Sequence, residues 1–507
     1  MRGHLKVFCV LMFFAAILFA QESVFIKKIV IKNSPKDLKP KLEKIVKPYE
    51  NRSLTIKDIR KIAFKLNYFL KKRGDVFMTV VLPPQKLNNG ILTFEVVRAK
   101  VGKIKVIGNR YFSKKFIKNN LDLNEGGYLS YPVLVNSLLF LNSYEDLMVK
   151  SYLSKGEKFG QTDITLKVED TRPFHASMFF DNLGSSSTSR YRWGTSVNLG
   201  NAIVNGDSVN LFTMFGLKKF NTKLYQIGYV TAPFTPSFTR IKTDYLYANY
   251  IVSGSLSVLD LRGDTHSYDI AFLQPLKYSL KNRTDLSIGY RRVHTRSYIL
   301  GKLSSQNKFN VLEFSLIWKH ISLFNTSNVV FKISHGFDNH NNIGSRVYEK
   351  SNFLKYNINV LMNKYVNKTF SSLFKCNVQY SSERLPLSQM FTIGGLSSVR
   401  GFDTTTKSGD YGYVLSAELI FQPLIGKKQN FSWQTGLFID NGGVYLHKPV
   451  PGEEKAVNMT GSGFEVIFSY KKRASMKVGI GFPLNCTSKK SQDNGPRIYA
   501  LAQLKLW

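Results

Sequence analysis

The sequence predicts a membrane β-barrel of about sixteen antiparallel strands, preceded by two small α+β domains. Three observations lead to this fold class. The first twenty residues are typical of an export signal. After them, no run of about 18 apolar residues occurs, as a membrane-spanning helix would need. The last two-thirds of the chain is a series of short runs of alternating polarity, rich in Phe and Tyr.

Residues 1–20 are predicted to be a signal peptide. Arg2 and Lys6 give a positive start, an apolar core follows, and Ala20 is a small residue at the cleavage position. Cleavage would remove Cys9. Two cysteines would then remain, 110 positions apart in the sequence, at 376 and 486. Nothing in the sequence decides whether they pair or stay free thiols.

The chain is strongly basic, with 71 Lys and Arg against 34 Asp and Glu and a formal net charge of +37. The excess is spread over the whole chain rather than gathered in a tail. A spread of this kind indicates a solvated surface and gives no reason to expect a nucleic-acid partner.

Residues 21–98 are predicted to form the first α+β domain. A strand at 25–31 is followed by helices, the second of which Thr55 caps, with Asp58 completing a capping box. Its apolar residues fall on one helical face: Ile59, Ile62, Ala63, Leu66, Phe69 and Leu70. Two more strands follow Gly74.

Residues 99–170 repeat this order of elements. A strand at 102–109 precedes a helix near 113–120, a second helix begins near Pro132, and two strands close the segment. The sequence therefore contains an internal duplication of a unit of about 70–75 residues.

Residues 171–507 are predicted to form the barrel. In residues 208–215 (SVNLFTMF) successive side chains alternate between two faces, directly after the hairpin signal Asn-Gly at 205–206. Runs of about 8–12 residues with the same pattern recur at 268–276, 411–424 and 474–482. The alternative fold is a soluble β-sandwich or propeller. Strand length, the signal peptide and the final aromatic Trp507 favour the barrel.

Four stretches of the sequence match motifs of a known family. They are LPPQKLNNGILTFEVV (82–97), LMVKSYLSKGEKFGQTDITLKVED (147–170), DNLGSSSTSRYRWG (181–194) and VRGF (399–402). In this order they resemble the two-partner secretion transporters of the TpsB, or haemolysin-activator, type. The resemblance covers the whole mature chain. It implies that 21–98 and 99–170 are POTRA domains in the periplasm and that 171–507 is a sixteen-stranded outer-membrane barrel.

The resemblance also implies a site within the barrel. Its VRGF motif, here Val399, Arg400, Gly401 and Phe402, lies on the sixth surface loop, which folds back into the lumen. There the arginine meets the aspartate of an F-x-D motif on a later strand. In this chain that motif is Phe438-Ile439-Asp440.

The residues themselves agree with such a site. Strand alternation places Phe438 and Asp440 on the lumen side. Gly394 and Gly395 give the loop the freedom to turn. A lumenal arginine and carboxylate stabilise each other only as a pair. The alternative is that Arg400 is an ordinary surface-loop charge.

Two features depart from the family pattern. The first strand begins within about five residues of the predicted cleavage site, which leaves no room for the amphipathic helix that plugs the barrel in many members. The resting pore is then closed by the loop of Arg400 alone, or it is open. In the last strand, Lys505 and Gln503 occupy positions where barrels usually place apolar residues, and its register stays open.

The sequence shows no catalytic constellation and no phosphate-binding glycine loop, so neither an enzyme nor a cofactor is expected. His335 and His340 lie in what reads as a polar loop, with no third ligand for a metal. No metal site is predicted.

The function that the resemblance implies is passive transport of a β-rich exoprotein of the TpsA type to the cell surface by a monomeric barrel in outer-membrane lipid. The POTRA domains would bind the exoprotein. The main alternative is an outer-membrane assembly factor, which shares the VRGF motif but generally carries three or more POTRA units. A plain adhesin or porin would leave the N-terminal domains unexplained.

Overall fold

The computed structural model describes residues 23–218, 220–338, 342–423, 430–471, 473–488 and 495–506. The predicted signal peptide, His340 and Trp507 lie outside these ranges. The described chain forms two compact units. The first comprises the segments up to Asn109, Ile117–Asn142 and Met148–Glu169. The second comprises Arg110–Phe116, Ser143–Leu147 and the chain from Asp170 onward.

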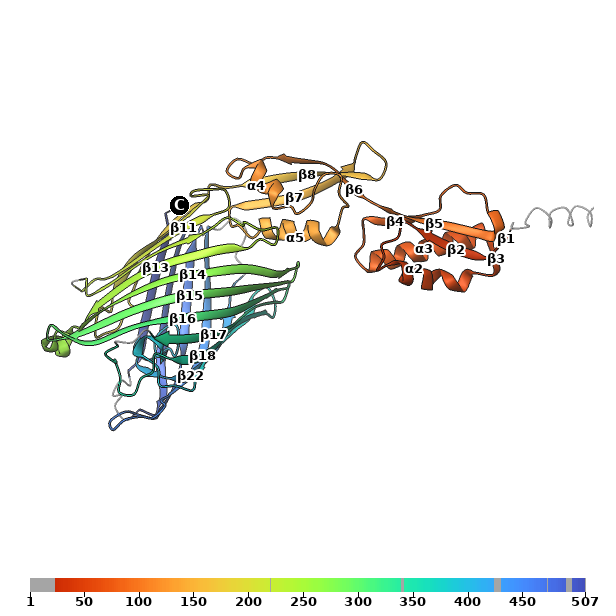
Figure 1. The fold of residues 1–507 in the computed structure, drawn as a ribbon. Coiled ribbons are helices and arrows are strands. Elements are labelled where there is room, and N and C mark those ends of the chain that lie inside the picture. Colours follow the sequence, from red (N-terminus) through yellow and green to blue (C-terminus); the bar gives the residue numbers. More distant parts are fainter. Residues whose placement is uncertain are drawn as a thin grey trace, which may run out of the picture. The chain divides into compact units, whose positions relative to one another are not determined.

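The first unit holds two small sheets that share one strand order (Figure 1). The first sheet has the order β2-β5-β4 and the second has the order β6-β8-β7, so in each the last strand in sequence lies in the centre. The strands are β2 (Lys28–Lys32), β4 (Met78–Val81), β5 (Ile91–Arg98), β6 (Lys100–Ile107), β7 (Leu147–Lys155) and β8 (Gln161–Asp170). The shared order agrees with the duplication that the sequence predicts.

Helices accompany each sheet of the first unit. They are α2 (Lys39–Val46), α3 (Ile56–Lys72), α4 (Lys114–Asn119) and α5 (Tyr131–Leu141). A separate pair of strands, β1 (Ser23–Ile26) and β3 (Arg52–Thr55), leads into α3. Among the helices that the structure describes, none is long and apolar enough to cross a membrane.

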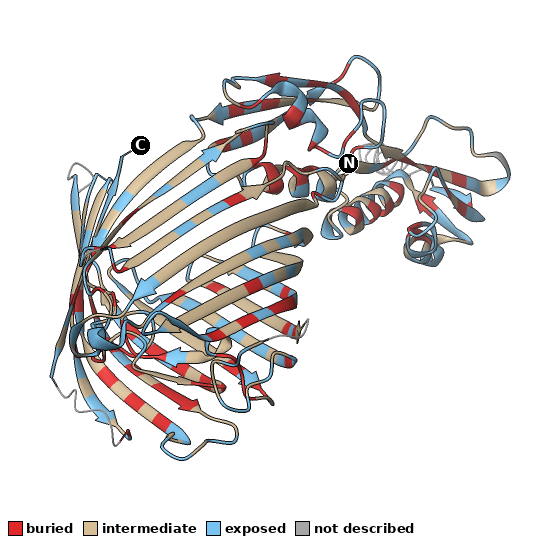
Figure 2. Ribbon diagram, turned by 60° about the vertical axis from the view of Figure 1, so that its left-hand side comes forward, coloured by how far each residue is buried: buried red, intermediate tan, exposed pale blue. Residues whose placement is uncertain are grey.

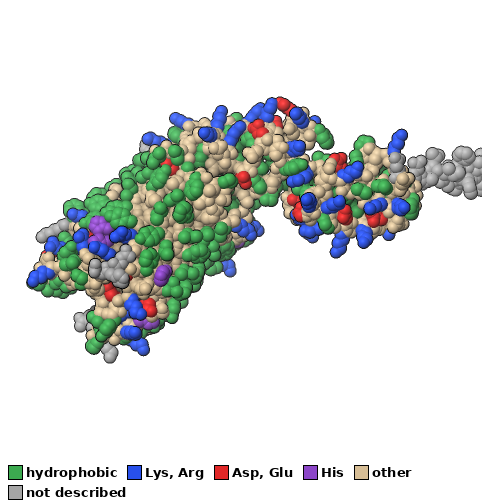
Figure 3. Space-filling view, in the orientation of Figure 1, with side chains coloured by type: hydrophobic (Ala, Val, Ile, Leu, Met, Phe, Trp, Pro, Cys, Tyr) green, Lys and Arg blue, Asp and Glu red, His purple; other side chains and the backbone are tan. Residues whose placement is uncertain are grey.

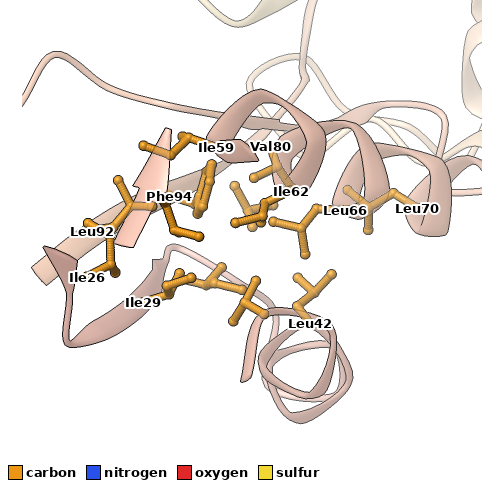
Figure 4. Packing of buried hydrophobic residues seen from close by; sticks show 14 of the residues in the cluster. Ile26, Ile29, Leu42, Ile59, Ile62, Leu66, Leu70, Val80, Leu92 and Phe94 are labelled. Atoms are coloured by element: carbon orange, nitrogen blue, oxygen red, sulfur yellow. The ribbon is translucent and has the colours of Figure 1, made fainter. Parts of the chain in front are cut away.

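Helix α3 begins and packs as the sequence predicts. The Thr55 hydroxyl accepts a hydrogen bond from the Asp58 backbone N–H (3.2 Å), and the Thr55 N–H donates to the Asp58 carboxylate (3.0 Å). The apolar face of α3 points at the sheet in Figure 4, and its Ile62, Leu66 and Leu70 belong to the same buried cluster as Phe94 of β5. Each of these four side chains is fully buried. Their burial stabilises this domain by roughly 1.5–3 kcal/mol per side chain.

The second unit contains a closed barrel of sixteen antiparallel strands, as the sequence predicts (Figure 1). The strands are β9 (Phe174–Asp181), β10 (Arg192–Gly200), β11 (Ser208–Gly216), β12 (Thr222–Val230), β13 (Arg240–Ile251), β14 (Arg262–Tyr278), β15 (Asn282–Ile299), β16 (Lys302–Ile321), β17 (Asn325–Asp338), β18 (Phe353–Tyr365), β19 (Phe370–Ser381), β22 (Tyr411–Phe421), β23 (Phe431–Tyr445), β24 (Ala456–Tyr470), β25 (Ala474–Cys486) and β26 (Arg497–Lys505). Strand β26 pairs with β9 and closes the barrel.

Side chains on the barrel strands alternate between an outer apolar face and the lumen, and Figure 2 shows buried and exposed positions alternating along individual strands. On β23, Leu437 and Ile439 are 62% and 52% exposed, whereas Phe438 and Asp440 are buried. The outer wall of the barrel presents a broad hydrophobic surface in Figure 3. A surface of this kind is suited to lipid.

The structure also settles two points that the sequence left open. Cys376 on β19 and Cys486 at the end of β25 are both free thiols. On β26, Ile498 and Leu504 are exposed on the outer face, and the buried Tyr499 faces the lumen. One expectation was wrong, because His335 lies within strand β17 and not in a loop.

Two short segments near residues 110 and 145 pack on the β10–β11 turn within the second unit. The Ser113 N–H donates to the Asn205 side chain (2.9 Å), and the Tyr144 hydroxyl donates to the Gly206 carbonyl (3.1 Å). Burial raises the pKa of Tyr144 from its ordinary value of 10 to about 12. The turn is thereby fixed by hydrogen bonds from outside the barrel sequence.

Candidate functional site

The candidate site is built on residues 382–410, the connection between β19 and β22, which we name the inward loop. It is the sixth connection at the end of the barrel that also carries the β9–β10 connection. Part of the loop forms a small hairpin of β20 (Phe391–Ile393) and β21 (Lys407–Gly409). The loop then enters the lumen, where it contacts inward-facing side chains of β22, β23 and β24.

Glycines allow the inward loop to turn where it does. Gly394, Gly395 and Gly401 have φ angles of 104°, 91° and 102°, a backbone region that other residues rarely adopt. At Gly401 the space is also closed, because a Cβ would lie 2.8 Å from the backbone carbon of Phe482. The loop backbone therefore lies directly against β25.

Arg400 is 2% exposed and makes three hydrogen bonds to Asp440. Its Nε and Nη2 donate to the two carboxylate oxygens at 2.7 and 2.8 Å, and its backbone N–H donates to Oδ2 at 3.0 Å. This is a bidentate pairing of a guanidinium with a carboxylate, which fixes the orientation of the Arg400 side chain and also balances its charge. The structure thus brings together the arginine and the aspartate that the resemblance pairs.

Further groups on the wall complete the surroundings of Arg400. Its Nη1 donates to Glu418 and Glu465, both at 3.1 Å, and its Nη2 donates to the Ser416 hydroxyl at 3.1 Å. The ring of Phe438 lies 3.4 Å from the guanidinium carbon, so both members of the F-x-D motif contact the arginine. A buried charge is tolerated when its hydrogen-bonding capacity is used in this way.

Val399 and Phe402, on either side of the Arg400–Gly401 pair, anchor the loop through apolar packing. They are 0% and 1% exposed and belong to a cluster at one end of the lumen. Its other members are Ile393, Val414, Val444, Val457 and Met459. The four residues of the VRGF motif therefore have different roles. Val399 and Phe402 pack in an apolar cluster, Arg400 forms ion pairs, and Gly401 lets the loop backbone approach β25 closely.

Three glycines of the barrel wall lie directly against the inward loop. A Cβ at Gly461 would lie 1.8 Å from the Arg400 carbonyl oxygen, and one at Gly481 would lie 2.5 Å from the Gly401 nitrogen. A Cβ at Gly442 would likewise lie 2.8 Å from the Val399 side chain. Larger residues at these three positions on β23, β24 and β25 would collide with the loop. The glycines therefore allow the loop to lie against this part of the wall.

Sequence reasoning missed four partners of the loop: Ser416, Glu418, Glu465 and Tyr499, whose hydroxyl accepts a hydrogen bond from the Gly401 N–H. A usable signal was present for two of them. Glu418 and Glu465 are charges inside otherwise apolar strand runs, on the same alternation as lumen residues. Nothing in the sequence indicated Tyr499.

The base of the inward loop is held by a second buried charge group. Asp410 is fully buried and accepts hydrogen bonds from Arg346 (2.7 Å) and from the backbone N–H groups of Leu385 and His447 (2.8 Å each). Arg384 donates to Glu453 at 2.6 Å. The two ends of the loop are thereby tied to the β17–β18 and β23–β24 connections.

A cavity of about 670 Å³ borders the loop on its other side. Its wall, on β13–β17, carries three cations and three anions: Lys242, Arg291, Lys332, Asp244, Asp269 and Glu313. They are paired with one another, as in Lys242–Asp244 at 2.8 Å and Arg291–Glu313 at 3.2 Å. Ser388 and Gln389 of the inward loop also line this cavity. This part of the lumen is therefore polar but balanced in charge.

Two family models match the chain. Residues 160–467 match the haemolysin secretion/activation protein family ShlB/FhaC/HecB, and residues 24–98 match the ShlB-type POTRA domain. The first match spans most of the barrel and includes the inward loop together with Asp440.

Individual proteins give a consistent result. The heme/hemopexin transporter protein HuxB of Haemophilus influenzae is 22% identical over 473 residues, which cover 90% of this chain and 83% of HuxB. The solved structure of CdiB from Escherichia coli superposes with a TM-score of 0.83 at 19% identity, covering 96% of this chain and 91% of CdiB.

A further solved structure matches the fold with a lower TM-score. BamA from Haemophilus ducreyi, solved without its POTRA domains 1–3, has a TM-score of 0.53 at 16% identity and covers 95% of this chain and 100% of that structure. The fold agreement is lower than for CdiB, and the family model that matches is that of secretion transporters. The chain therefore belongs to the ShlB/FhaC/HecB family and is an outer-membrane transporter of two-partner secretion with periplasmic POTRA domains.

Proposed function

We propose that this transporter passes an unfolded, β-rich exoprotein through its barrel lumen and that the inward loop is the movable closure of that path. The observation that carries the proposal is the burial of Arg400 by three barrel strands. A guanidinium held by Asp440, Glu418 and Glu465 fixes the loop inside the lumen. Moving the loop breaks one localised set of bonds rather than the barrel itself.

The charge-balanced wall on β13–β17 supports the same path. An unfolded chain presents acidic, basic and apolar segments in turn, and a strongly charged wall would hold those of opposite sign. The wall of paired charges next to the inward loop avoids this. Folding of the exoprotein at the cell surface then gives the movement its direction, and no catalytic step is required.

The N-terminal domains are proposed to capture the exoprotein first, through its N-terminal secretion domain. Residues 21–100 contain 19 basic and 7 acidic residues, a net charge of +12, whereas residues 101–170 contain 10 and 8, a net charge of +2. An acidic segment of the exoprotein is therefore expected to meet the first POTRA domain. We retain the boundaries 21–98, 99–170 and 171–507 for the three parts, and a monomeric barrel in outer-membrane lipid.

A deletion strain compared with its parent tests the proposed function. Mass spectrometry of the culture medium and the outer membrane should show one or two large β-rich proteins missing from the surface or the medium, with other barrels at normal levels. A general fall in outer-membrane barrels would instead indicate an assembly factor. That function is the second candidate, because assembly factors share the VRGF motif.

The variant Arg400→Ala tests the role of the inward loop. It leaves Asp440 buried without its partner, which costs about 3–5 kcal/mol locally and releases the loop. We expect secretion to be lost while the barrel remains inserted. Arg283→Ala, which removes an arginine from β15 away from the loop, is the control. Normal secretion by Arg400→Ala would contradict the role of the loop.

A further inference from the structure

The outer wall of the barrel changes from apolar to basic at the same level on the neighbouring strands β14, β15 and β16. Inward-facing positions on these strands line the lumen, so the positions between them face outward. The strand register aligns three successive outward-facing rows, which are Ile270, Tyr290 and Leu312, then Tyr268, Arg292 and Asn310, then His266, His294 and Lys308. The apolar band of the wall therefore ends at a common boundary on all three strands.

This boundary lies toward the cell surface. The periplasmic domains precede β9, so β9 begins at the periplasmic end of the barrel and the β9–β10 connection lies at the surface. Because antiparallel strands alternate in direction, the β13–β14 and β15–β16 connections lie at the surface as well. The basic rows are on the side of the boundary that leads to these connections. They therefore lie at the level of the lipid headgroups of the extracellular leaflet, next to an aromatic girdle.

Two cations at this level lack a partner within the protein. Arg292 and Lys308 are exposed, and neither forms an ion pair with a described residue. The nearby carboxylate of Asp264 is already bound by Arg296 at 3.0 Å and lies 3.6 Å from His266. A charge on a lipid-facing wall is costly unless it reaches water or an opposite charge. Phosphate groups of the surrounding lipid can supply that charge here.

An apolar groove of about 560 Å³ begins beside Arg292 on the same outer wall. Its other outward-facing side chains are Ile227, Tyr229, Thr243, Tyr245, Tyr268, Ile270 and Tyr290. Thr243 pairs with Tyr229 on one side and Ile270 on the other, and as the smallest of the three it leaves the groove deep. Arg292 belongs to the lining row nearest the cell surface. The groove therefore joins a cation at the headgroup level to an apolar channel within the membrane.

Contacts among the aromatic residues fix the shape of this groove. The rings of Tyr245 and Tyr268 lie 4.9 Å apart, and the Tyr245 hydroxyl lies 3.0 Å from Nδ1 of His266. The Tyr290 hydroxyl donates to the Asn310 side chain at 2.8 Å. A site that is formed before its ligand arrives loses less entropy on binding.

We propose that this part of the wall binds one phosphorylated lipid of the extracellular leaflet, with a phosphate between Arg292 and Lys308 and an acyl chain in the groove over Thr243. Arg292 and Lys308 are diagonal neighbours on adjacent strands, about 7–8 Å apart, so their long side chains can converge on one phosphate. A guanidinium also binds phosphate through two parallel hydrogen bonds. In an outer membrane, the extracellular leaflet consists of lipopolysaccharide, whose lipid A part carries phosphates and acyl chains. Lipopolysaccharide is therefore the occupant.

Native mass spectrometry of the full-length transporter in detergent, titrated with lipopolysaccharide, tests the proposal. The test variant is Arg292→Gln/Lys308→Gln. The matched control is Lys364→Gln/Lys368→Gln, which removes two exposed lysines at the periplasmic end of β18. We expect the test variant to bind lipopolysaccharide roughly tenfold more weakly than the wild type, and the control to bind as the wild type does. The heat-induced shift in gel electrophoresis shows that each barrel is folded.

A second variant tests the groove independently of charge. Thr243→Phe fills the floor of the groove, so we expect weaker binding of lipopolysaccharide although Arg292 and Lys308 remain. Dephosphorylated lipopolysaccharide should bind the wild type as weakly as intact lipopolysaccharide binds the test variant.

Three results would overturn the inference, and none of them bears on transport of the exoprotein. The first is equal binding of lipopolysaccharide by the wild type and the test variant. The second is equally strong binding of phosphatidylglycerol at the same residues, which would show a surface for any anionic lipid. The third is displacement of lipopolysaccharide by inorganic phosphate, which would show that the groove contributes nothing.

Discussion

At the scale of single residues, the carboxylates around Arg400 are not equivalent. Asp440 receives three hydrogen bonds from Arg400, whereas Glu418 receives one. The difference predicts how the wall responds to neutral substitutions that keep the shape of the side chain.

We expect Asp440→Asn to abolish secretion and Glu418→Gln to retain most of it. The amide introduced by Asp440→Asn cannot accept from both prongs of the guanidinium, so the charge of Arg400 loses its main partner. Glu465 and Asp440 still bind Arg400 when Glu418 is replaced. Secretion of the exoprotein and protease sensitivity of the inward loop in intact cells measure the effect. Equal loss in both variants would contradict the ranking.

A glycine of the wall gives a steric prediction. In Gly461→Ala the new Cβ would lie 1.8 Å from the Arg400 carbonyl oxygen, so the inward loop has to move away from the wall. We expect increased labelling of a cysteine introduced at Ser397, with the barrel still inserted. Gly495→Ala is the matched control, since no atom lies within 4 Å of its added Cβ. Identical labelling in the two variants would contradict the prediction, because it would show that the contact between the loop and the wall tolerates a methyl group at position 461.

At the scale of elements, the start of α3 depends on its capping box. Hydrogen bonding by the Thr55 hydroxyl holds the pKa of Asp58 below its ordinary value of 3.8. A carboxyl whose pKa is lowered on folding stabilises the fold above its ordinary pKa, and this contribution is lost as the pH falls through the lowered value. The cap is therefore complete at neutral pH and fails in acid.

Thr55→Ala should destabilise the start of α3 by about 1 kcal/mol at neutral pH. Hydrogen-exchange protection of residues 56–72, corrected for the intrinsic rate at each pH, measures the loss. The difference from the wild type should shrink as the pH falls below 3.8 and through the lowered pKa of Asp58, because below that pKa Asp58 is protonated in both proteins. A difference of the same size in acid and at neutral pH would contradict the role of Asp58.

At the scale of the whole molecule, the barrel holds its shape without a disulfide. Strands β19 and β25 are separated in the sheet by β22, β23 and β24, so Cys376 and Cys486 lie on strands that are not neighbours. The closed hydrogen-bonded sheet supplies the stability instead, because a closed barrel has no unpaired edge.

We therefore expect the heat-induced shift of the barrel in gel electrophoresis to be the same with and without reducing agent. The double variant Cys376→Ser/Cys486→Ser should behave as the wild type. A band that appears only without reductant, and is absent from the double variant, would show that the two thiols pair after all.

The sequence by itself determined the architecture, because strand alternation, hairpin signals and helix caps are local patterns set by the period of each element. It also pointed to Arg400 and Asp440, through motifs that stand in the right order. Only the tertiary structure showed Glu418, Glu465 and Tyr499 at the same site. They come from three strands, and the register of these strands decides which side chains meet. A shift of one residue in the register would turn every side chain of a strand to the opposite face of the sheet.

The hydrogen bond from the Val80 N–H on β4 to the Asn67 side chain on α3 was likewise beyond the sequence. An asparagine within a helix has no local signature of a role, and Asn67 reaches Val80 only because α3 packs against β4. Long-range packing thus decided which polar residues serve the sheet edges. Local patterns decided only that helices and sheets would form.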